Sequence, residues 1–224
     1  MESSDFLYSI CMFRKELESA LQQASFAIEQ LKQERCLLFI QQTAHLLAET
    51  FRKGNKLIIA GNGGSLCDAA HFAEELTGLF RQKRRALPAI ALSEPGHITC
   101  TGNDLGFDYI FSRGVEAYGK PGDLFIGLTT SGNSANILNG FKRAKEMGLH
   151  TVAFLGKSGG LIKGMADLEL LIEGFSTSDR IQEAHMTAIH IIIELMELEL
   201  FSSKPPQELD LPKAAHEKLS TLLS

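Results

Sequence analysis

The sequence predicts an α/β protein with a doubly wound, five-stranded parallel sheet, helices on both faces and a helical N-terminal extension. Three observations support this prediction. The first glycine is Gly54, so an uninterrupted helical pattern fills the N-terminal segment. After it, the pattern changes to short apolar runs that end in glycine or hydroxyl residues. Segments of helical character separate these runs, as expected for parallel strands joined by crossover helices.

The N-terminal segment is expected to form two amphipathic helices. The first places apolar residues at intervals of three and four, which is the spacing of one helix face, and a second helical pattern follows it. Such a face must be buried against the core or against another chain. The residues are Phe6, Ile10, Phe13, Leu17 and Leu21 in the first helix, and Leu37, Leu38, Ile40, Ala44, Leu47 and Phe51 in the second.

Five strands and four helices are expected after this extension. The strands lie in KLIIAG, PAIALS, DLFIGLTTSG, HTVAFLG and LELLIEG, and the helices at 66–81, 107–118, 135–147 and 179 to about 201. The tail begins SSKPPQELDLP, which predicts a linker before a short terminal helix. Ligands of such sheets lie beyond the carboxyl ends of the strands, so the loops that follow the strands are the expected place of the chemistry.

The composition excludes several classes of protein. A net charge of -5, from 22 basic and 27 acidic residues, provides no overall positive field for nucleic acid or an anionic membrane surface. Apolar stretches such as 189–193 are far shorter than the roughly 20 residues of a membrane span, and no export signal opens the chain. We therefore expect a cytoplasmic protein without a membrane or nucleic-acid partner. Its four cysteines lack CxxC pairing and are expected to be reduced.

Two polar loops follow strands and open helices. The first contains GNGGS at 61–65, whose glycines permit positive φ angles and let backbone N–H groups face an anion. It does not fit the dinucleotide fingerprint, because Leu66 replaces the last glycine, and it is not a P-loop. The second, TTSGNS at 129–134, offers four hydroxyl groups, more than helix capping requires. Together they predict a sugar-phosphate pocket, although the glycines alone are also compatible with a tight turn.

The expected helix after the first loop carries titratable residues. His71 and Glu75 are one turn apart on its polar face, and Asp68 precedes His71 by three residues. An imidazole and a carboxylate at this spacing are acceptable ligands for Zn²⁺ or a similar ion. The same spacing is also ordinary for an ion pair on a solvated helix.

The last expected helix carries a second set of candidates. Gln182 and His190 share one side of it, about 12 Å apart along the axis. With this separation, one alternative is that His190 contacts the helix of His71 and Glu75 only in a neighbouring subunit. His185, on the same helix, is expected to make a structural hydrogen bond.

Four blocks of the sequence resemble the phosphoheptose isomerases, which have the sugar-isomerase (SIS) fold. They are GNGGSLCDAAHFAEELTG, HITCTGNDLGFDYIFSR, TSGNSANI and SDRIQEAHMTAIHIIIELME, and the likeness runs from about Lys56 to about Leu200. It implies a flavodoxin-like three-layer sandwich in a cytoplasmic homotetramer, with active sites close to subunit interfaces. Residues 1–54 would be oligomerisation helices, 55–202 the sugar-phosphate-binding domain and 203–224 a C-terminal tail.

The resemblance also implies the site residues. Glu75 and His190 would be the catalytic acid/base pair. One zinc ion per subunit would be held by His71, Glu75, Gln182 and His190. The positions that would bind substrate lie in the two loops, in the GND block and on the two helices: Asn62, Gly63, Gly64, Ser65, Glu75, Asn103, Asp104, Thr129, Thr130, Ser131, Ser134 and Gln182.

The implied reaction interconverts D-sedoheptulose 7-phosphate and D-glycero-D-manno-heptose 7-phosphate, the first step of heptose supply for the lipopolysaccharide core. It needs an open-chain sugar, a base that carries a proton between C1 and C2, and an acid for the hydroxyl protons of an enediol. We expect Glu75 to move the carbon proton and His190 the oxygen protons. A bound metal would polarise the carbonyl.

Two positions depart from the family pattern. Leu66 stands where members commonly carry histidine, and Leu79 where they commonly carry arginine. An arginine beside an anionic substrate is a bidentate donor, so its loss affects substrate affinity. A run of basic residues follows Leu79. It could replace the missing arginine, or it could simply be a solvated charged segment. The run consists of Arg81, Lys83, Arg84 and Arg85.

Two other functions are compatible with this fold. Some SIS relatives are non-catalytic tetramers that bind the bacterial replication initiator and share the RIQE segment, and others isomerise or sense different phosphosugars, such as pentose phosphates. A pure scaffold has no physical need to keep Glu75 and His190 with the rest of the ligand set, which argues against the first alternative. The depth of the pocket would distinguish a protein that acts on a shorter phosphosugar from one that acts on a seven-carbon sugar.

Overall fold

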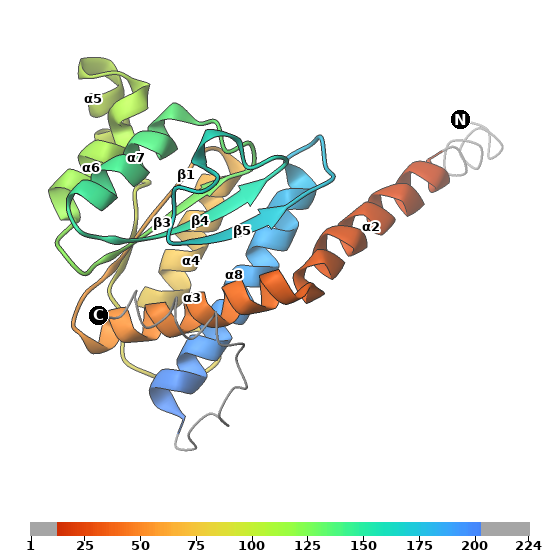
Figure 1. The fold of residues 1–224 in the computed structure, drawn as a ribbon, viewed down its shortest axis with the longest axis horizontal. Coiled ribbons are helices and arrows are strands. Elements are labelled where there is room, and N and C mark those ends of the chain that lie inside the picture. The colour runs from red at the N-terminus through yellow and green to blue at the C-terminus, as the bar shows by residue number, and fades with distance from the viewer. Residues whose placement is uncertain (1–12, 203–224) are drawn as a thin grey trace, which may run out of the picture.

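Five parallel strands form one sheet in the order β2-β1-β3-β4-β5, and β1, β3, β4 and β5 are labelled in Figure 1. The strands are β1 (Leu57–Gly61), β2 (Ala89–Ala91), β3 (Leu124–Thr129), β4 (His150–Gly156) and β5 (Leu168–Ile172). They fall in the five apolar runs predicted from the sequence, so the predicted fold class is confirmed. The computed structural model describes residues 13–202. Phe6, Ile10 and the expected tail elements lie outside the described residues.

Helices cover both faces of the sheet, which makes three layers. One face packs against α3 (Glu34–Arg52), α4 (Gly64–Thr77) and α8 (Asp179–Phe201). The other packs against α5 (Pro95–Asp104), α6 (Ile110–Tyr118) and α7 (Ala135–Glu146), with the 3₁₀ turns η2 (Phe107–Tyr109) and η3 (Gly160–Ile162) beside them. Within the described range, no helix combines the length and apolar character that a bilayer span requires.

The alternation of strand side chains divides the core in two. In β1, Leu57 and Ile59 belong to the cluster beneath α3, α4 and α8, whereas Ile58 and Ala60 belong to the cluster beneath α6 and α7. Successive strand residues point to opposite faces, and both faces are covered here. A continuous apolar run, rather than an alternating one, is therefore the pattern that this buried parallel strand requires.

The N-terminal helices differ in how they are buried. Helix α3 contributes Ile40, Ala44, Leu47 and Phe51 to the core, as its periodicity predicts, but Leu37 of the predicted stripe is 42% exposed. Helix α2 (Arg14–Glu29), joined to α3 through η1 (Gln30–Lys32), projects away from the sheet at the right of Figure 1. Its apolar positions are largely exposed in the single chain, so this stripe is not covered by the chain's own core.

Helix boundaries follow local chemistry that periodicity alone does not reveal. The helix expected at 66–81 begins earlier, at Gly64, and ends before Gly78. The segment expected at 107–118 is divided into η2 and α6. Helix α5 is additional to the predicted helices. Pro95 occupies the first turn, and the Glu94 carboxylate accepts hydrogen bonds from the N–H groups of Gly96 and His97.

Candidate functional site

A polar cavity of about 270 Å³ lies beyond the carboxyl ends of β1 and β3. These strands are neighbours in the sheet, yet the chain visits the edge strand β2 between them, so the cavity lies at the topological switch point of the sheet. Both predicted loops line it. The lining residues that were predicted to bind substrate or metal are Asn62, Gly64, Ser65, Thr129, Thr130, Ser131, Ser134 and Gln182. Leu128 and Ser178 also line it and were not predicted.

The first loop depends on its glycines at two points. Gly63 has φ 55° and ψ -122°, a conformation that essentially only glycine adopts. A Cβ atom on Gly64 would lie 2.6 Å from Nε2 of Gln182, so the missing side chain lets the Gln182 amide approach the start of α4. The same amide donates to Oγ of the buried Ser65 at 3.4 Å. These contacts place Gln182 at the first turn of α4.

The second loop is held by its own hydroxyl groups. Oγ1 of Thr129 accepts from the backbone N–H of Gly132 at 3.2 Å and lies 3.3 Å from Oγ of Ser134. Oγ1 of Thr130 lies 2.9 Å from Oγ of Ser178, the residue before α8. A serine in that position ordinarily caps its helix, but this hydroxyl makes no capping bond and pairs with the loop instead. This is how Ser178 reaches the cavity.

Three helices begin at the cavity. The first turn of α4 contains Gly64 and Ser65, Ser134 precedes α7, and Ser178 precedes α8. Within the described chain, no lining residue is charged. The positive ends of the helix dipoles and the hydroxyl groups are therefore what the cavity offers an anion such as a phosphate.

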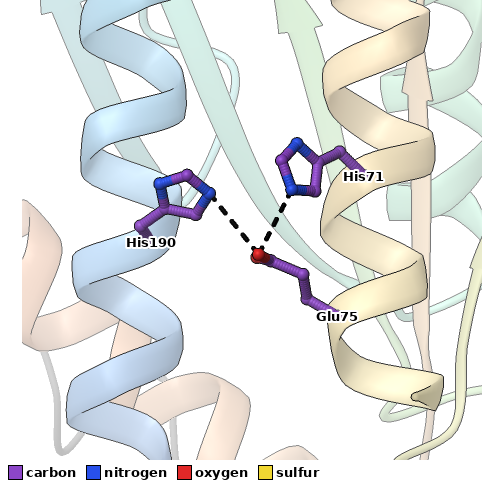
Figure 2. Close-up of side chains that lie close together, drawn as sticks. All are labelled: His71, Glu75 and His190. Carbon is purple, nitrogen blue, oxygen red and sulfur yellow. Dashed lines mark hydrogen bonds and ion pairs between the residues drawn. The ribbon is translucent and has the colours of Figure 1, made fainter. Parts of the chain in front are cut away.

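Further along α4 than the cavity, one carboxylate lies between two imidazoles. Oε1 of Glu75 is 3.2 Å from Nε2 of His71 and 3.5 Å from Nε2 of His190. Figure 2 shows both rings turned toward this oxygen, one from α4 and one from α8. The Glu75 side chain is 11% exposed, and those of His71 and His190 are 45% and 40% exposed. The ring of Phe80 stacks on His190, with centroids 5.8 Å apart.

His190 meets α4 within one chain, so the contact does not need a neighbouring subunit. The axial separation of Gln182 and His190 has a simple consequence here. Gln182 contacts Ser65 at the start of α4, and His190 contacts Glu75 further along the same helix, because α4 and α8 run side by side. The distance from Gln182 to His190 along α8 therefore corresponds to the distance from Ser65 to Glu75 along α4.

The cluster of His71, Glu75 and His190 can hold a metal ion. One ligand atom from each lies within 4.8 Å of the others. The other carboxylate oxygen of Glu75, Oε2, is buried and has no hydrogen-bond partner, so the site leaves one acceptor unsatisfied. Two imidazole nitrogens and a carboxylate oxygen form a donor set typical of divalent metals such as zinc. The residues present therefore fit such an ion.

Asp68 lies one turn before His71 and is a further polar group of α4. Burial raises the pKa of its carboxyl to about 6, partly opposed by the charge of His71. Its Oδ2 atom is also buried without a hydrogen-bond partner.

Asn103 and Asp104 are not brought to the cavity within the single chain. They end α5, where Nδ2 of Asn103 donates to Oδ1 of Asp104 at 2.7 Å and Sγ of Cys100 lies 3.5 Å from Oδ2 of Asp104. Gly63 is exposed and lies beside the lining residues rather than among them. For Asn103 and Asp104, substrate binding stays a prediction.

The basic run after α4 contacts other parts of the chain. The guanidinium of Arg84 forms a buried ion pair with Glu197 of α8, and Arg81 pairs with Glu194 of the same helix. Leu79, at the position of the family's arginine, is 59% exposed. Within the described residues, none of these side chains lines the cavity.

Comparison with known proteins identifies relatives in sequence and in structure. The SIS domain model matches residues 19–156. A phosphoheptose isomerase of Fusobacterium nucleatum is 57% identical over 168 residues, which cover 75% of this chain and 86% of that protein. One from Vibrio cholerae is 47% identical and is covered over its full length by 84% of this chain. The structure of phosphoheptose isomerase from Neisseria gonorrhoeae has a TM-score of 0.75 at 32% identity, covering 83% of this chain and 98% of that one.

Proposed function

This chain belongs to the phosphoheptose isomerase family of SIS-domain proteins, and we propose that it interconverts D-sedoheptulose 7-phosphate and D-glycero-D-manno-heptose 7-phosphate. The observation that carries the proposal is one juxtaposition. Helices α4 and α8 both contribute to a cavity of hydroxyls and helix N-termini at their starts, and further along they bring Glu75 and His190 together. The reaction would supply heptose for the lipopolysaccharide core.

The cavity is suited to the phosphate end of the sugar. Thr129, Thr130, Ser131 and Ser134 provide hydroxyl groups, and backbone N–H groups at the starts of α4 and α7 provide further donors. Asn62 and Gln182 would contact sugar hydroxyls. Asn103 and Asp104 would join the site from the end of α5 of another subunit.

Glu75 would move the proton between carbons. In the direction from ketose to aldose, its carboxylate takes a proton from C1 and returns it to C2 by way of the enediol. His190 donates a proton to the oxygen on C2 and accepts one from the hydroxyl on C1, so no proton is gained or lost overall.

We further propose that His71, Glu75 and His190, with Gln182, hold one zinc ion per subunit. When bound, the ion would supply Lewis-acid polarisation of the substrate's carbonyl oxygen. The support for His71, Glu75 and His190 is their donor set and the unsatisfied Glu75 oxygen, whereas Gln182 is included because the family resemblance implies it. Elemental analysis of protein purified without chelators tests this proposal. Zinc near one equivalent per chain is expected, and its absence would contradict it.

We also propose that the protein is a homotetramer in the cytoplasm. Phe13, Leu17 and Leu21 are 58%, 59% and 62% exposed along α2 and the residue before it, so this stripe needs an apolar partner. Light scattering on Leu17→Glu/Leu21→Glu should report a smaller assembly. Ser19→Glu, on another side of the same helix, should leave the tetramer intact.

The activity is tested by incubating purified protein with sedoheptulose 7-phosphate and following the aldose by NMR. A panel of shorter ketose phosphates in the same assay measures the selectivity for seven carbons. Conversion of the seven-carbon sugar is expected. No conversion with or without added zinc would contradict the proposal and would return attention to a non-catalytic scaffold.

A further inference from the structure

Asn62 and Asn136 pair their side-chain amides across the switch point of the sheet. Nδ2 of Asn62 donates to Oδ1 of Asn136, and Nδ2 of Asn136 donates to Oδ1 of Asn62, each at 2.9 Å. Asn62 follows β1 and lines the cavity, whereas Asn136 is 2% exposed in the first turn of α7. The pair therefore ties the first loop to the helix that follows the second loop.

A backbone group determines how both amides are oriented. The N–H of Ile137, in the first turn of α7, donates to Oδ1 of Asn136 at 2.9 Å. N–H groups in that turn have no acceptor within their helix. Turning the Asn136 amide over would bring an NH₂ group against this donor. Oδ1 of Asn136 must therefore face Ile137, and Nδ2 of Asn62 must face Oδ1 of Asn136.

We propose that Asn136 is a positioning residue for the sugar-phosphate cavity, acting through Asn62. This inference rests on the proposed function. The paired amides use one hydrogen and one lone pair of Asn62, which leaves one N–H and one lone pair for a sugar hydroxyl. Because Asn136 is buried behind Asn62, it holds the first loop at a set distance from residues 129–134 without touching the substrate.

Asn136→Asp is a sharp test because it keeps the shape and changes one donor into an acceptor. One carboxylate oxygen still accepts from Ile137 and Asn62, but the other faces Oδ1 of Asn62. If the Asn62 amide turns over, its Oδ1 instead faces the carboxylate oxygen that accepts from Ile137. No orientation of Asn62 therefore restores both hydrogen bonds. Asn139→Asp is the matched control. Asn139 lies one turn further along α7, and its Nδ2 donates to the Asp108 carbonyl, outside the cavity.

Five quantities are measured on the full-length variants. Amide hydrogen exchange of residues 62–66 should accelerate about tenfold or more in Asn136→Asp, because the loop loses its anchor. The calorimetric Kd for sedoheptulose 7-phosphate and the KM should both rise about tenfold. The kcat and zinc content should change less than about threefold, because Glu75 and His190 are not disturbed. Asn139→Asp should match the wild type in all five.

The outcomes separate this inference from the proposed function. Unchanged exchange at 62–66, or a fall in kcat at constant KM, would overturn the positioning role. Additive losses of affinity in Asn62→Ala, Asn136→Ala and their double variant would also overturn it, since action through Asn62 requires non-additivity. If the wild type neither binds nor converts the sugar phosphate, the proposed function fails, and the exchange data still decide whether Asn136 holds the loop.

Discussion

Oε1 of Glu75 and Nε2 of His190 lie 3.5 Å apart, although one belongs to α4 and the other to α8. The contact is made within a single chain because the two helices pack side by side on the same face of the sheet. A carboxylate and an imidazole at this distance can serve one substrate together.

Replacement of Glu75 should abolish most of the activity. In Glu75→Gln the amide cannot accept the carbon proton, so we expect kcat to fall by about 100-fold or more. The zinc content should also fall, because a charged oxygen ligand is lost. Glu74→Gln is the control, since this neighbouring carboxylate is 68% exposed and lies 3.8 Å from His71. Near-normal turnover of Glu75→Gln would rule out the assigned base.

The two histidines should each be needed for metal binding. His71→Ala and His190→Ala should both purify with less zinc than the wild type, whereas His150→Ala, at the start of β4, should not. Removal of the metal by a chelator should lower the Tm of the wild type, and added zinc should restore it, because binding to the folded state stabilises that state. A Tm that does not respond to the chelator would contradict a bound metal.

The Arg84–Glu197 pair should contribute strongly to stability. Nε of Arg84 lies 2.6 Å from Oε1 of Glu197, and both side chains are 1% exposed. The Arg84 guanidinium also donates to the backbone carbonyl of Glu75 at 2.7 Å, so it joins α4 to α8. Arg84→Met leaves a buried charge unpaired and should cost about 3 to 5 kcal/mol in the free energy of unfolding.

Denaturant unfolding at a fixed protein concentration measures this cost. The double variant Arg84→Met/Glu197→Met should recover most of it, because no charge remains buried. Arg81→Met is the control. Arg81 pairs with Glu194 at the surface and is 59% exposed, so its loss should cost less than about 1 kcal/mol. Equal losses for Arg84→Met and Arg81→Met would refute the assigned difference.

His185 should make the fold sensitive to acid. Burial lowers the pKa of this imidazole to about 4, outweighing the opposite effect of its hydrogen bond to the Leu155 carbonyl. As the pH falls below about 6.5, the unfolded chain binds a proton that the folded chain does not bind until about pH 4. Stability is therefore complete above this window and is lost as the pH falls through it, by about 3 kcal/mol.

Measuring the free energy of unfolding from pH 7 to pH 4 tests this sign. His185→Gln should lose less stability over that range than the wild type.

His45 provides the opposite case, because its hydrogen bond with Glu199 raises its pKa despite burial. Its contribution is present below the ordinary pKa and is lost as the pH rises through the raised value. The free energy of unfolding of His45→Gln should therefore approach that of the wild type as the pH rises.

The fold could be predicted because its signals are local. The run from Leu57 to Gly61 is apolar throughout, which a strand buried on both faces requires, and the glycines after it permit the turn into α4. His185 was also expected to make a structural hydrogen bond, and its bond to Leu155 confirms this. Helix α5 was missed because its capping residue is Glu94 rather than one of the usual small polar residues.

The sequence by itself determined the strands, the polar loops and the one-turn spacing of His71 and Glu75, because backbone conformation and helix periodicity depend on residues close in the chain. Only the tertiary structure decided that His190 meets Glu75, that Ser178 pairs with Thr130, and that Asn136 holds Asn62. These contacts join residues far apart in sequence, and they depend on how helices pack on the sheet. Side-chain spacing along a single helix carries no information about that packing.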